Sequence, residues 1–159
     1  MTLEKQDRSR WDAGMIRAAI EAVGAGSAAG DGGQPPGAYT IQAWIAAEHC
    51  LATSYERTRW DRIVALYDML VACVPGPVVR LNRAAAVAMV DGPAAGLAAA
   101  EEAGEGGVLD RYPYLHTLRA DLLRRLGRVD EARGALRAAL GCVEDGPQRR
   151  EIEARLAGM

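Results

Sequence analysis

The chain contains two histidines, His49 and His116, each beside polar side chains at helical spacing. Tyr39 and Gln42 precede His49 by about three and about two helical turns, so all three side chains share one face of a helix. An imidazole titrates near neutral pH, and among polar groups it acts as a general base or binds a ligand. The same spacing also suits two hydrogen-bonded histidines that only stabilise the fold, and both interpretations stay open.

The sequence lacks the common motifs of metal and nucleophile sites. His49 and Cys50 are adjacent, so they point in different directions on a helix. There is no C-x-x-C, H-x-x-x-H, H-E-x-x-H or G-x-S-x-G pattern, and no P-loop. We therefore expect no metal and no cofactor, and we assign no catalytic residue.

Cysteines, charge and hydropathy indicate the cellular setting. Cys50, Cys73 and Cys142 are widely spaced, which favours reduced thiols that we expect to be buried in helices. The charged N-terminus is not a signal peptide, and no apolar run approaches membrane-spanning length. The net charge of −2 gives no drive toward nucleic acid. We expect a cytoplasmic protein that binds neither nucleic acid nor membrane.

Apolar side chains recur at helical spacing along the chain, and Gly and Pro separate the periodic segments. No segment alternates with the period of a strand. The pattern predicts a loop over 24–37, and helices over about 9–23, 38–52, 60–74, 78–90, 93–103, 113–126, 129–140 and 147–157.

A helix, a tight break and a second helix occupy 81–97, and this pattern returns about 36 residues later, at 119–136. The segment 126–132 is typical of the turn of a tetratricopeptide repeat, in which a glycine ends one helix and Asp-Glu-Ala opens the next. The prediction is an all-α, tetratricopeptide-like array of about eight antiparallel helices. Residues 1–36 form a capping helix and a Gly/Pro-rich loop, and residues 37–159 form the repeat domain.

Most of the chain resembles the C-terminal tetratricopeptide-like extension of extracytoplasmic-function RNA polymerase sigma factors of group 42. The resemblance extends over residues 6–12 and 37 to about 156, about four-fifths of the chain. The segments that match most clearly within it are 6–12, 37–43, 45–49, 60–68, 77–97, 114–116 and 119–127. The family's promoter-reading and polymerase-binding regions have no counterpart, so we expect the extension alone or a stand-alone relative. Trp44, where the family more often has a small residue, is a departure that could alter the groove.

The resemblance implies a non-catalytic interaction module that contacts the sigma core, RNA polymerase or another protein. The alternative is a stand-alone small-molecule binder or enzyme, with His49 as acid or base and Trp44 and Trp60 as pocket walls. Asn82 either fixes the stacking of repeats or offers its amide to a bound peptide. The candidate binding residues under the two hypotheses are Tyr39, Gln42, Trp44, His49, Trp60, Asn82, Arg83 and His116.

Overall fold

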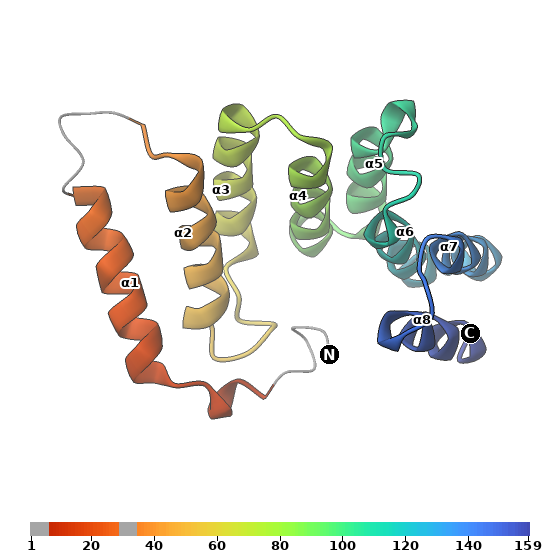
Figure 1. Cartoon of the computed structure of the whole chain (residues 1–159), viewed down its shortest axis with the longest axis horizontal. Helices are drawn as coiled ribbons and strands as arrows, with labels where there is room; N and C mark the ends of the chain where they lie inside the picture. The colour runs from red at the N-terminus through yellow and green to blue at the C-terminus, as the bar shows by residue number, and fades with distance from the viewer. Residues whose placement is uncertain (1–6, 29–34) are drawn as a thin grey trace. The chain divides into compact units, whose positions relative to one another are not determined.

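The computed structural model describes residues 7–28 and 35–159, and within these residues it is all-helical, without strands. The all-α prediction is therefore confirmed for this part of the chain (Figure 1). In the part of the chain that the structure describes, the 3₁₀ helices η2 (Arg8–Arg10) and η3 (Glu105–Gly107) accompany the α-helices. The α-helices are α1 (Ala13–Ala28), α2 (Ala38–Leu51), α3 (Trp60–Cys73), α4 (Pro77–Val90), α5 (Pro93–Ala103), α6 (Pro113–Arg125), α7 (Val129–Gly141) and α8 (Pro147–Ala157).

The chain forms two compact units, residues Met1–Pro75 and Gly76–Met159. The first contains α1 to α3, and the second contains α4 to α8. The predicted division between residues 36 and 37 falls inside the first unit and stays a prediction.

In the first unit, α2 and α3 run side by side in opposite directions, and α1 lies along α2 (Figure 1). The buried side chains of α2 and α3 recur at spacings of three and four, which places them on one face of each helix. They are Ile41, Ile45 and Glu48 on α2, and Ile63, Leu66 and Leu70 on α3.

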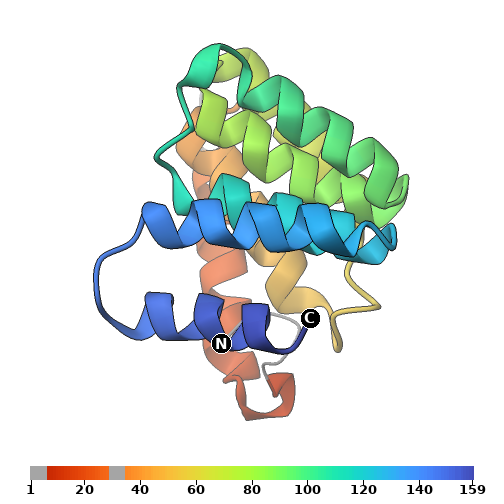
Figure 2. The same cartoon turned by 90° about the vertical axis from the view of Figure 1, so that its right-hand side faces the viewer.

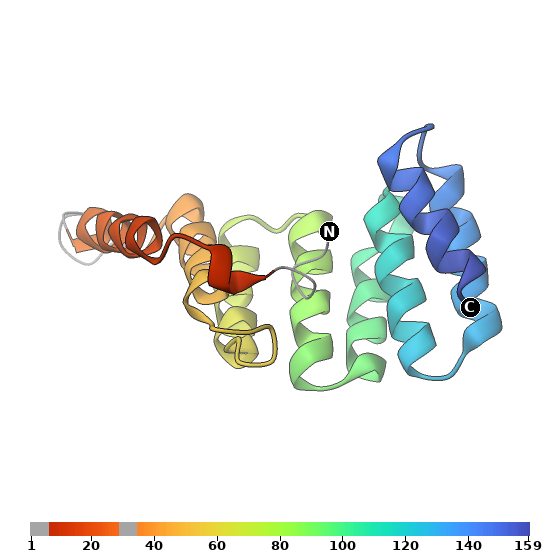
Figure 3. The ribbon, with the colours of Figure 1, turned by 90° about the horizontal axis from the view of Figure 1, so that it is seen from below.

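In the second unit, each helix packs on the next, from α4 to α8 (Figure 3). The helices α6 and α7 begin 36 residues after α4 and α5 respectively, so the period in the sequence is a period of the helices. Figure 2 shows α8 lying beside α7 at the end of the chain. Its one buried residue, Ile152, packs with Leu136 and Ala139 of α7, and the half-buried Leu156 packs against the same cluster.

Small side chains bring α4 and α5 close together. A Cβ atom at Gly96 would collide with the Cβ of Ala88 and would lie 2.8 Å from its Cα. The break between these helices needs a glycine for a different reason, because Gly92 has a φ of 90°. Glycine adopts this positive φ without strain, and Pro93 begins α5, since its fixed φ suits the first turn of a helix.

Both predicted ends of α1, near residues 9 and 23, were wrong. The helix begins at Ala13 and not near residue 9, because Asp12 accepts hydrogen bonds from the backbone N–H groups of Gly14 and Met15, at 2.8 and 2.9 Å. The helix also continues to Ala28, through the start of the predicted loop. Residues 29–34 of that loop lie outside the described part of the chain.

Candidate functional site

In the first unit, the carboxyl end of α2 is capped by Arg8, a residue distant in the sequence. Its Nη1 donates to the carbonyl oxygens of His49 and Ala52, both at 2.9 Å, and of Ser54, at 3.1 Å. The last carbonyls of a helix have no partner within it and carry partial negative charge. A guanidinium satisfies both needs, so Arg8 holds η2 against the connection between α2 and α3.

Beside this cap, the carboxylate of Glu48 is buried, with only 5% of its side chain exposed. Arg59 donates to both of its oxygens, at 2.8 and 3.1 Å, and Arg62 approaches to 2.8 Å. A buried carboxylate requires such partners. Glu48 is therefore a structural residue that ties α2 to the start of α3.

His49 packs edge-on against Trp60, with ring centroids 5.3 Å apart. Its Nδ1 is buried, and no hydrogen-bond partner lies near it among the described residues. Burial and the charge of Arg8 lower the pKa of His49, an effect that Glu48 opposes. The imidazole is consequently neutral at pH 7, and its surroundings are those of a packed side chain.

The structure brings His49 and Trp60 together, but it distributes the other predicted site residues widely. On α2, Tyr39 is 88% exposed, Gln42 is exposed and Trp44 is half-buried. The remaining predicted residues, Asn82, Arg83 and His116, belong to the second unit, where Asn82 and Arg83 are half-buried on α4.

His116 is buried on α6, and it positions the loop that precedes this helix. Its Nε2 lies 2.7 Å from the backbone carbonyl oxygen of Asp110. The thiol of Cys142 lies 3.4 Å from the same oxygen and 3.3 Å from the carbonyl oxygen of Ala138, and its single hydrogen is shared between them. These two contacts fix the backbone of Asp110. His116 therefore acts as a hydrogen-bonded histidine that stabilises the fold, which was one of the two interpretations open from the sequence.

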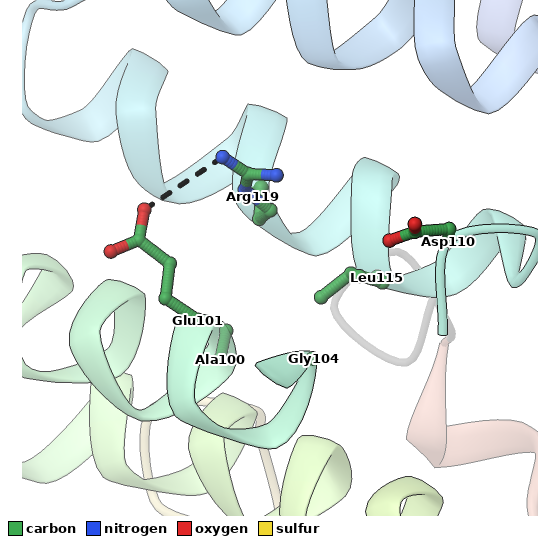
Figure 4. A pocket seen from close by; sticks show the side chains of 6 residues that line it. All are labelled: Ala100, Glu101, Gly104, Asp110, Leu115 and Arg119. Atoms are coloured by element: carbon green, nitrogen blue, oxygen red, sulfur yellow. Dashed lines mark ion pairs between the residues drawn. The ribbon is translucent and has the colours of Figure 1, made fainter. Parts of the chain in front are cut away.

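A pocket of about 150 Å³ opens next to this loop (Figure 4). Carboxylates stand on opposite sides of it, Glu101 on α5 and Asp110 on the loop, and Leu115 lies between them. The full lining is Ala100, Glu101, Gly104, Asp110, Leu115 and Arg119. Its volume is below that of pockets that enclose a metabolite or a drug, so it accommodates about one side chain.

The charges near the pocket form a loose network. Arg119 Nη2 lies 3.8 Å from Glu101 Oε1, beyond hydrogen-bond distance. The hydrogen-bonded Arg128 lowers the pKa of Glu131, and the positive charge of Arg119 acts in the same direction. Arg119 therefore lies within the field of two carboxylates, Glu101 and Glu131. Among the described residues, no cation pairs with the carboxylate of Asp110.

Exposed apolar and aromatic side chains lie close in the sequence to Asp110, one of the residues that line the pocket. Tyr112 and Tyr114 meet edge to face, with centroids 6.3 Å apart, at the start of α6. Val108, in the same loop as Asp110, is 66% exposed. We call the pocket together with Val108, Tyr112 and Tyr114 the α5–α6 face.

The sequence analysis did not identify Glu101, Asp110 or Arg119 as candidate site residues. Their positions in the sequence do not indicate that Glu101, near the end of α5, and Asp110, before α6, line the same pocket. The adjacent Tyr112 and Tyr114, exposed beside a helix-starting proline, were the available signal.

One expectation about the cysteines was wrong, because Cys73, at the end of α3, is exposed and not buried. Two ion pairs join neighbouring turns of α6 and α7. Asp121 pairs with Arg124 at 3.1 Å, while Arg125 donates to the carbonyl of Ala88. Asp130 lies 3.6 Å from Arg133.

No family model and no solved structure matches the chain. Over 154 residues, 97% of this chain, the sequence is 41% identical to a protein of Rhizobium meliloti (strain 1021) that is described only as uncharacterized. The chain spans 35% of that relative's length. Because the match covers nearly the whole chain, both units have counterparts in the longer protein.

None of the described helices is both long and apolar enough to cross a membrane.

Proposed function

We propose that this chain is a non-catalytic protein-interaction module, equivalent to the regulatory extension of an extracytoplasmic-function sigma factor. In this proposal the helix pairs α4–α5 and α6–α7 are tetratricopeptide-like repeats. Their 36-residue offset and the glycine-terminated turn between α6 and α7 support that assignment.

The observation that carries the proposal is the α5–α6 face. It combines a pocket for about one side chain with two exposed tyrosines and an exposed valine. Tyrosine is enriched among the residues that dominate binding energy at protein interfaces, and rigid helix ends present it at little entropic cost. A partner segment that inserts one side chain and packs on the tyrosines suits this surface.

The longer relative is consistent with this proposal, because about two thirds of its length lies outside the matched segment. A sigma core requires additional chain of that kind. The partner in the proposal is therefore the sigma core or RNA polymerase, reached in the same chain or in a separate one.

The alternative function, a small-molecule binder or enzyme based on His49, has weaker support. A general base needs an accessible nitrogen and a pKa near the working pH. His49 has a buried Nδ1 and a lowered pKa, and its ring is packed on Trp60.

The test is a binding assay of the whole chain with two probes, an extracytoplasmic-function sigma core and core RNA polymerase from the same genome. We expect binding to one of them, and we expect the Tyr112→Ala/Tyr114→Ala variant to bind about ten-fold more weakly or worse. Val90→Ala removes an exposed apolar side chain elsewhere in the unit and should bind normally. Absence of binding to both probes at concentrations on the order of tens of micromolar would contradict the proposal.

A further inference from the structure

The pocket of the α5–α6 face has an accessible negative charge that its own residues do not neutralise. The carboxylate of Asp110 lies at its edge, on an exposed residue, without a paired cation among the described residues. His116 and Cys142 hold the backbone of this residue from behind. The carboxylate is therefore presented on a fixed support, an arrangement that lowers the entropic cost of binding.

The one cation of the pocket lining, Arg119, is outnumbered by carboxylates. Arg119 directs Nη2 toward Glu101, as Figure 4 shows, its Nε is buried, and 38% of its side chain is exposed. Glu131 adds a further negative charge near this guanidinium. The lining itself sets Glu101 and Asp110 against this single cation, so its charge favours a cationic ligand over an acidic one.

The remaining lining is apolar and small. Ala100 and Leu115, 0% and 4% exposed, close the floor of the pocket, and a Cβ atom at Gly104 would lie 3.2 Å from Leu115 Cδ2. The glycine therefore leaves space next to Leu115. Lysine and arginine combine an aliphatic stem with a cationic head, so such a side chain matches an apolar floor with a carboxylate at its edge.

We infer that the α5–α6 pocket receives a basic side chain of the protein partner, with its charged head at Asp110 and its stem on Leu115. The inference rests on the proposed interaction function and names the chemistry that the partner presents. Tyr112 and Tyr114 would then contact the residues that flank the basic one.

The inference is tested by nuclear magnetic resonance on the ¹⁵N-labelled whole chain, with three probes of matched backbone. The probes are N-acetyl-argininamide, its neutral glutamine analogue and its acidic glutamate analogue. We expect saturable shifts of the Gly104, Asp110 and Leu115 amides with the arginine probe, at a Kd on the order of millimolar. The neutral and acidic probes should give weaker effects.

Matched variants separate the site from general charge attraction. Asp110→Asn should weaken the arginine probe by about three-fold or more, whereas Asp91→Asn removes an exposed carboxylate at the end of α4 and should change nothing. Equal binding of the acidic probe, or equal binding to Asp110→Asn and wild type, would overturn the inference.

The same variants distinguish this inference from the proposed function. If the sigma core or polymerase binds and Asp110→Lys binds equally well, the inference fails and the interaction function stands. If the arginine probe binds at Asp110 and neither macromolecule does, the basic-side-chain site stands and the proposed partners are wrong.

Discussion

The guanidinium of Arg8 donates a 2.9 Å hydrogen bond to the backbone carbonyl of His49, a residue 41 positions further along the chain. This contact links the segment before α1 to the end of α2. Such caps satisfy carbonyl groups that a helix leaves without partners, so their loss affects the helix end first.

Arg8→Ala should lower the free energy of unfolding by about 1–3 kcal/mol, because three carbonyls lose a charged donor. Arg8→Lys keeps the positive charge but lacks the fork of N–H donors, so its free energy of unfolding should lie between those of wild type and Arg8→Ala. Urea denaturation measures the loss, and hydrogen exchange of residues 49–58 locates it. Arg10→Ala, an exposed neighbour, is the control, and equal stability of the Arg8→Ala and Arg10→Ala proteins would contradict the capping role.

Gly92→Val should destabilise the protein by about 1–3 kcal/mol, because a β-branched residue is strained at a φ of 90°. Gly76 is a matched control: it also precedes a proline that begins a helix, but its φ is −101°. Gly76→Val should change the stability by less than about 0.5 kcal/mol. Thermal denaturation compares the Gly92→Val and Gly76→Val proteins. Equal melting temperatures of the two variants would show that the turn at Gly92 tolerates another conformation.

Gly96→Ala should destabilise the protein by about 1–3 kcal/mol, because its methyl group would push α5 away from Ala88 of α4. Gly134 also lies within a helix, α7, yet a Cβ there meets nothing within 4 Å. Gly134→Ala should therefore stabilise the protein by about 0.5–1 kcal/mol. The two substitutions thus have opposite signs in urea denaturation, and a shared sign would refute the close approach of the helices.

Acidification should reduce the stability through His49, since burial and then Arg8 lower its pKa in the folded state. The unfolded chain, with an ordinary pKa near 6.5, binds the proton first as the pH falls. The stability contribution of neutral His49 is therefore present above about pH 6.5 and is lost as the pH falls toward the lowered pKa. The difference in unfolding free energy between wild type and His49→Gln measures it, and a difference that is equal at pH 7.5 and pH 5.0 would exclude this linkage.

The sequence by itself determined the helices. Apolar spacing and Gly or Pro breaks are local signals, so the predicted ends of α2 to α8 agree with the structure to within about two residues. The positive φ of Gly92 was equally local, because a tight turn before Pro93 requires it. The start of α1 was missed, although it too depends on a nearby residue, the capping side chain of Asp12.

Only the tertiary structure decided which side chains meet. Arg8 and His49 are joined across 41 residues, and Glu101 and Asp110 line the same pocket because α5 packs on α6. The same packing buries His116 and gives it a backbone partner, although its polar neighbours suggested a binding residue. Helical period fixes the face on which a residue lies, but the packing of helices determines what that face contacts.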